Sequence, residues 1–182
     1  VKGVLASENA SLCIVDRNRS TSGSDKMCFP PRFAKHSIPS ISHKELQAAH
    51  KLFGWTVNLN SVTDSETMCA MRVYEVQALG GLLLTNYALS TSLRFPGVFT
   101  VFDGDEVGRI MGGYSERELA DLRVEGVRDM YSGCTVYDRL GEVLGACGLA
   151  GRPAQPPAYV VCPEGDEAAR ALFEDQECPG KR

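Results

Sequence analysis

Two apolar segments, separated by a polar loop and a helical segment, constrain the fold of this chain more than any other feature. Residues 55–60 (WTVNLN) alternate apolar and polar side chains, and residues 82–85 (LLLT) are typical of a buried strand. The helical segment between them ends at Gly80 and Gly81. A strand, a helix and a strand in this order predict an α/β fold with a Rossmann-like parallel sheet flanked by helices.

The loop at residues 60–67 carries more hydrogen-bonding side chains than a simple connection needs. They are Asn60, Ser61, Thr63, Asp64, Ser65, Glu66 and Thr67. In an open parallel sheet, ligands bind beyond the carboxyl ends of the strands, where loops meet the free N–H groups of helix N-termini. We therefore expect a ligand at this loop, and we expect Ser65 or Thr67 to be the N-cap of the following helix.

Glu75 is expected about two turns inside that helix, among apolar neighbours. A carboxylate in such surroundings needs a hydrogen-bonding or charged partner. The vicinal hydroxyls of a ribose would supply one. The guanidinium of nearby Arg72 would supply another.

An ordered set of short motifs resembles the two-Rossmann-domain, or B-type, glycosyltransferases, in particular the spore-protein CgeB-like group. The motifs are residues 42–46 (SHKEL), the strand at 55–59, residues 74–80 (YEVQALG) and the strand at 82–85. The block at residues 67–75 is similar to that group's own version of the motif, and the resemblance covers about residues 12–147. It implies the donor-binding half of a hexosyltransferase, which uses a nucleoside diphosphate sugar and an acceptor hydroxyl of a glycan, polyol or lipid-linked molecule.

The same resemblance implies roles for individual residues. Glu75 matches the glutamate that binds the donor ribose, whereas Thr67 stands where many members have a second glutamate. Contacts to the diphosphate then fall to the loop, and Arg72 would orient Glu75 or meet a phosphate. The implied donor-binding set is Glu75, Arg72, Thr67, Ser65, Asn60 and the N–H groups of Met68 and Cys69.

The loop at residues 86–92 follows the second strand and would reach the sugar or the pyrophosphate through Asn86 and Tyr87. Its alternative interpretation is a solvated loop that caps a helix near Leu93, because Asn and Ser commonly serve turns. No metal or other cofactor is implied. The catalytic residues are not identified, and a general base is expected in a part of the enzyme outside this chain.

The remaining pattern extends the α/β prediction. Strands are expected at residues 12–16 and 98–102, and helices at 44–52, from Asp103, at 115–131 and at 136–147. The acidic residues after Asp103 suit a helix N-terminus and read as caps. The donor-binding domain is predicted to span residues 1–150 and to lack its first strand, which leaves the isolated fragment inactive. Residues 151–157 read as a proline-rich linker, and residues 158–182 resemble the start of an A-type glycosyltransferase domain.

Composition excludes some classes of protein. A net charge of −4 with dispersed basic residues argues against a nucleic-acid-binding surface. An apolar run of about 18 residues, which a membrane span would need, is absent from the sequence. The seven cysteines form no C-x-x-C pair and their number is odd, which favours reduced thiols in the cytoplasm, with the inner membrane surface as an alternative location.

Two other functions stay open from the sequence. The first is a non-catalytic surface or spore-associated interaction module with a degenerate Rossmann domain, which the threonine at position 67 would fit. The second is a sugar-nucleotide epimerase, which shares the nucleotide-binding half but would need further acidic and histidine residues. Fold analogy alone does not separate these chemistries.

Overall fold

The computed structural model describes residues 2–6, 11–19, 29–149, 167, 168, 170 and 171. They belong to two compact units, Val1–Cys134 and Thr135–Arg182. The second unit contains helix α7 (Val136–Ala146), so this helix falls outside the unit that holds the sheets. The predicted linker and all but four residues of the predicted A-type segment lie outside the described residues.

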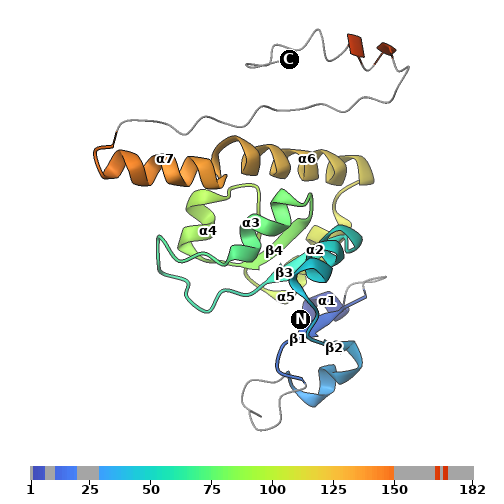
Figure 1. The fold of residues 1–182 in the computed structure, drawn as a ribbon. Coiled ribbons are helices and arrows are strands. Elements are labelled where there is room, and N and C mark those ends of the chain that lie inside the picture. The colour runs from blue at the N-terminus through green and yellow to red at the C-terminus, as the bar shows by residue number, and fades with distance from the viewer. Residues whose placement is uncertain (1, 7–10, 20–28, 150–166, 169, 172–182) are drawn as a thin grey trace. The chain divides into compact units, whose positions relative to one another are not determined.

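The first unit alternates strands and helices along the chain (Figure 1). Its helices, one of them a 3-10 helix, and its strands are α1 (Lys2–Ala6), β1 (Ile14–Asp16), η2 (Pro31–His36), β2 (Ser37–Pro39), α2 (His43–Leu52), β3 (Trp55–Asn58), α3 (Met71–Ala78), β4 (Leu82–Asn86), α4 (Leu89–Arg94), β5 (Phe99–Val101), α5 (Gly104–Gly112) and α6 (Glu116–Gly133).

All strand pairs in the described residues are parallel. Strands β3, β4 and β5 form one sheet in that order, and β1 pairs with β2 in a second sheet. The register aligns Asn58 with Thr85 and Asn86 with Val101, so the three strands end close together. The predicted α/β fold, with Rossmann-like parallel sheets flanked by helices, is confirmed.

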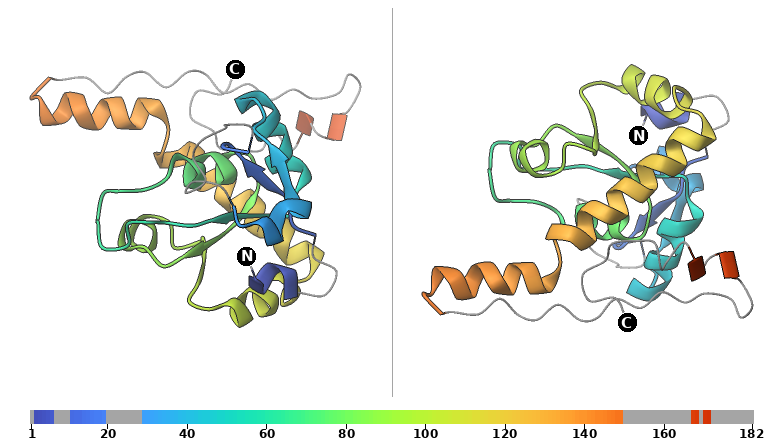
Figure 2. Two further views of the ribbon diagram at one scale, coloured as in Figure 1. Left: turned by 90° about the horizontal axis from the view of Figure 1, so that it is seen from below. Right: turned by 90° about the horizontal axis from the view of Figure 1, so that it is seen from above.

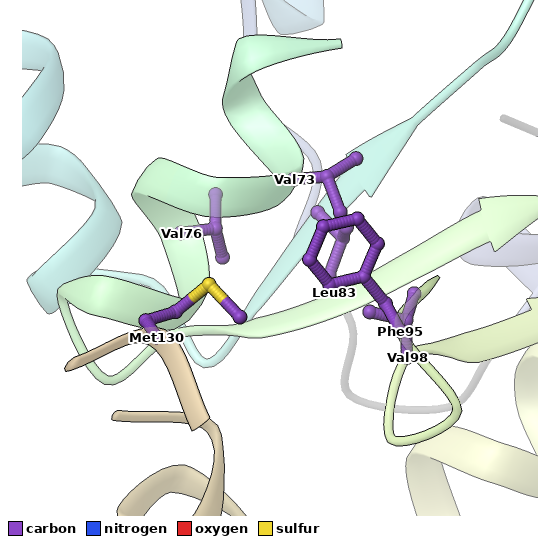
Figure 3. Close-up of a cluster of buried hydrophobic side chains, with 6 residues drawn as sticks. All are labelled: Val73, Val76, Leu83, Phe95, Val98 and Met130. Atoms are coloured by element: carbon purple, nitrogen blue, oxygen red, sulfur yellow. The ribbon is translucent and has the colours of Figure 1, made fainter. Parts of the chain in front are cut away.

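Strand β4 lies at the centre of the larger sheet, and its alternating side chains reach two separate cores. Leu83 packs with residues of α3, α6 and the segment after α4, in a cluster drawn in Figure 3: Val73, Val76, Phe95, Val98 and Met130. Leu84 packs with Val4 of α1 and Val107 of α5. The sheet is therefore covered by helices on both faces, as expected for a parallel sheet.

Two glycines occupy positions that disfavour any other residue. Gly80 ends α3 with φ +72°, a left-handed conformation that favours glycine, and its N–H donates to the carbonyl of Gln77 at 3.0 Å. Gly3 of α1 faces the backbone of Gly104 in α5, where a Cβ would clash. The two helices accordingly lie side by side in both views of Figure 2.

The helix start predicted at Asp103 is confirmed, because Asp103 is the N-cap of α5. Ser115 starts α6 with a capping box, in which the N–H of Glu118 donates to Ser115 Oγ and the N–H of Ser115 donates to the Glu118 carboxylate. Thr135 and Asp138 form a further capping box at the start of α7. Local hydrogen bonds of this kind depend on nearby residues, so the sequence alone predicts them well.

Candidate functional site

The middle of the carboxyl edge is a closed network of amide and hydroxyl groups. Asn58 and Thr85 are each 1% exposed, and Asn58 Nδ2 donates to Thr85 Oγ1 at 3.3 Å and to Asn60 Oδ1 at 2.9 Å. Asn60 Nδ2 also donates to Thr85 Oγ1 at 2.8 Å. Three further bonds join Asn60 and Asn86: Asn60 N donates to Asn86 Oδ1 at 2.6 Å, Asn60 Nδ2 to Asn86 O at 3.2 Å, and Asn86 Nδ2 to Asn60 O at 3.1 Å. These groups tie β3 to β4.

The loop between β3 and α3 closes over the start of helix α4. The N–H of Leu89 donates to the carbonyl of Thr63 at 2.8 Å, and the N–H of Ser90 donates to the carbonyl of Ser65 at 3.1 Å. The hydroxyl of Ser90, a fully buried residue, donates to the carbonyl of Met68. Helix α4 has no side-chain N-cap, so the loop satisfies the N–H groups that would otherwise be free at its N-terminus.

The N-cap predicted at Ser65 or Thr67 is wrong. Helix α3 begins at Met71, its N-cap is Ala70, and no side chain caps it. Ser65 forms a local turn instead, because its Oγ accepts hydrogen bonds from the N–H groups of Thr67 at 3.3 Å and Met68 at 3.1 Å. Of the two N–H groups assigned to the diphosphate, those of Met68 and Cys69, the N–H of Met68 therefore has an internal partner. Thr67 itself is exposed.

A second part of the loop prediction is also corrected. Residues 86–92 do not form one loop, because Asn86 ends β4 and α4 already begins at Leu89. Only Tyr87 and Ala88 connect the two elements. The predicted loop therefore shrinks to a short connection in which Tyr87 is 41% exposed.

Helix α3 is shorter than predicted, and Glu75 lies in its second turn. The Glu75 side chain faces helix α2. Its Oε1 is 3.2 Å from Nε2 of His43, the first residue of α2, and the Glu75 side chain is 27% exposed. Because α2 leads directly into β3, its N-terminus lies toward the carboxyl end of that strand. Arg72, which the sequence suggested as a partner of Glu75, forms no ion pair with it among the described residues.

His50 lies in the last turn of α2, at the opposite end of the helix from His43. It is 7% exposed, its Nδ1 is 3.2 Å from Thr56 Oγ1, and its Nε2 has no hydrogen-bond partner in the described part of the chain. Burial lowers the pKa of His50 below its ordinary value of 6.5, the Arg72 cation lowers it further, and Glu75 opposes the shift. His50 is thus the neutral, buried neighbour of the charged groups Arg72 and Glu75.

An aromatic pair follows the ends of β4 and β5. Tyr87 and Phe102 are stacked, with ring centroids 6.1 Å apart and an angle of 21° between the rings. Phe102 is 75% exposed. From the sequence, Phe102 was predicted only as the end of a strand. The available signal was its position, directly after a short, half-buried strand, which is where a parallel sheet presents side chains to ligands.

The arrangement combines an accessible carboxylate, a nearby cation and an exposed aromatic face at one edge of a parallel sheet. Such groups can bind hydroxyls, a phosphate and a ring. Cys69 packs against the core cluster, and burial raises the pKa of its thiol, which keeps it protonated. Among the described residues, no three His, Cys, Asp or Glu side chains gather into a group that could hold a metal ion.

Within the ranges that the structure describes, no helix is both long and apolar enough to cross a membrane. Comparison with protein-family models, with curated protein sequences and with solved structures finds no match for this chain.

Proposed function

We propose that this chain is the donor-binding part of a glycosyltransferase that transfers a hexosyl group from a nucleoside diphosphate sugar to an acceptor hydroxyl. The observation that carries the proposal is Glu75, a part-exposed carboxylate whose Oε1 lies 3.2 Å from His43 Nε2, near the carboxyl edge of a parallel sheet. Ligands of such sheets bind at that edge. A carboxylate there can accept two hydrogen bonds from the 2′- and 3′-hydroxyls of a ribose.

The diphosphate contacts are revised in the light of the loop. The N–H groups of Thr67 and Met68 already donate to Ser65, so the exposed Arg72, one turn before Glu75 in α3, becomes the favoured phosphate partner. A guanidinium suits this role because it presents several donors to phosphate oxygens. Stabilising the departing diphosphate is the main electrostatic task in such a transfer. The reaction is proposed for the cytoplasm or the inner membrane surface, without a metal cofactor.

Calorimetric titration of the 182-residue chain with UDP-, GDP- and dTDP-sugars tests this function. We expect one donor class to bind, and Glu75→Gln to weaken it about tenfold or more, because hydrogen bonds to a charged group contribute about 1.5–3 kcal/mol. Glu125→Gln, an exposed glutamate in α6, is the matched control and should leave the affinity unchanged. The proposal fails if no donor binds, and the role of Glu75 fails if its substitution has no effect.

A non-catalytic interaction module is the second candidate function. One observation favours it: carbonyls of Thr63 and Ser65 occupy the first N–H groups of α4, which removes a helix N-terminus from the groups able to bind phosphate. Donor binding separates the two candidates, because this chain is expected to be inactive under either of them. Binding of a nucleoside diphosphate sugar supports the donor-binding part of a transferase, and the absence of donor binding by the folded chain supports an interaction module.

A further inference from the structure

The exposed aromatic pair is not explained by the ribose and phosphate contacts. Tyr87 and Phe102 directly follow Asn86 and Val101, which are aligned neighbours in the parallel register of β4 and β5. The strand ends therefore place the two rings together, and they stack at an angle of 21°. Tyr87 stacks on one face of the Phe102 ring, whereas Phe102 as a whole stays 75% exposed. An open, flat apolar face results at the edge of the sheet where ligands bind.

We propose that this aromatic pair is the subsite for the hexopyranosyl ring of the donor, an inference that rests on the proposed function. A pyranose ring has an apolar face of C–H groups. Those hydrogens carry partial positive charge and are attracted to the negative face of an aromatic ring, while the hydroxyls around the rim stay in water. Phe102 offers such a face, and its backbone N–H is fixed by Glu106 Oε2 at 2.7 Å.

The order of groups along the donor favours the sugar over the base at this subsite. Glu75 faces α2, on the side of the edge strand β3, whereas Phe102 follows β5, which is two strands away. Neighbouring strands are about 4.8 Å apart, so the sheet alone separates these positions by about 10 Å. The base is joined directly to the ribose, but the glycosyl ring lies beyond the diphosphate. With the ribose at Glu75, the more distant ring is the sugar.

The test compares two ligands of each variant, the nucleoside diphosphate sugar and the corresponding nucleoside diphosphate. Phe102→Leu keeps an apolar side chain but removes the aromatic face. It should weaken the sugar donor about threefold to tenfold and leave the nucleoside diphosphate unchanged. The matched control is Phe53→Leu, since Phe53 is also exposed but ends α2 on the amino side of β3. This control should bind both ligands as the wild type does.

Two results overturn the subsite: equal affinity of Phe102→Leu and the wild type for the sugar donor, or an equal loss for the nucleoside diphosphate, which would place the base on Phe102. A second measurement does not depend on nucleotide binding. Methyl hexopyranosides added at high concentration should show upfield ring-current shifts of their C–H protons with the wild type and not with Phe102→Leu. Shifts without any nucleotide binding would keep the subsite and reject the proposed function, and their absence from the wild type would reject the subsite.

Discussion

At the carboxyl ends of β3 and β4 the polar side chains bond to one another, whereas on either side of them Glu75 and Phe102 keep exposed atoms. The central groups of Asn58 and Thr85 are 1% exposed, and their hydrogen bonds join the two strands. The Glu75 side chain is 27% exposed and Phe102 is 75% exposed. Polarity in a loop therefore does not identify a binding residue, because satisfied polar groups hold the scaffold and the accessible groups at its flanks remain for a ligand.

Removing the hydroxyl of Thr85 is expected to have the largest effect on stability. Thr85→Val keeps the shape but removes the acceptor shared by Asn58 Nδ2 and Asn60 Nδ2. We expect a loss of about 1–3 kcal/mol in the free energy of unfolding, because buried donors lose a partner. Denaturant unfolding measures it. The control is Thr100→Val, its aligned neighbour in β5, and an equal loss in both variants would contradict a special role of the network.

The attachment of the loop to α4 is expected to contribute less. Ser90→Ala removes the hydroxyl that donates to the carbonyl of Met68, which should cost about 1 kcal/mol. The exposed Ser92, whose hydroxyl donates to the carbonyl of Leu89 at 3.0 Å, provides the control Ser92→Ala. Chemical denaturation of both variants measures the difference. A larger loss for Ser92→Ala would show that the loop is not held in this way.

The sequence predicts the elements that depend on neighbouring residues, and it fails where the structure depends on distant ones. The apolar run at residues 82–85 and the acidic helix start at Asp103 are local patterns, and both predictions are confirmed. The start of α3 was predicted too early because Ser65 is a suitable N-cap in sequence but bonds within its own turn. The conformation of this loop depends on its hydrogen bonds to α4, a helix more than twenty residues further along the chain. No local sequence pattern encodes such a contact.

The candidate functional residues also differ in how far the sequence alone identifies them. Glu75 was recognisable as a lone carboxylate in an apolar helix, but its partner His43 comes from another helix. The roles of Glu75, Arg72 and Tyr87 in donor binding stay predictions. Phe102 was missed because its significance depends on the register of β4 and β5, which places it on Tyr87. Residues that meet only through tertiary packing are invisible to a reading of local periodicity.

Acidification should destabilise the protein through His50. Because burial lowers the pKa of His50 in the folded chain, the unfolded chain binds more protons between that lowered pKa and the ordinary value of 6.5. Stability is therefore fully present above about pH 6.5. It declines as the pH falls from there toward the lowered pKa of the folded state. Unfolding of the wild type and His50→Gln between pH 5 and 8 tests this, and identical pH slopes would contradict it.

Removing the contact between Glu75 and His43 should have the smallest effect on stability. The His43 side chain is 64% exposed and its Nε2 lies 3.2 Å from Glu75 Oε1, and even a charged pair at such an exposed position contributes about 0–1 kcal/mol. Glu75→Gln and His43→Gln are both expected to unfold within about 1 kcal/mol of the wild type. Thermal and denaturant unfolding measure the difference. A loss as large as that of Thr85→Val would make Glu75 part of the scaffold.

The decisive experiment measures stability and donor affinity on the same samples of Glu75→Gln and Thr85→Val. We expect opposite outcomes: Glu75→Gln loses donor affinity about tenfold and keeps its stability, and Thr85→Val loses stability and keeps its affinity below its unfolding transition. The contradicting result is a Glu75→Gln variant that binds the donor as the wild type does, while Thr85→Val, still folded, does not.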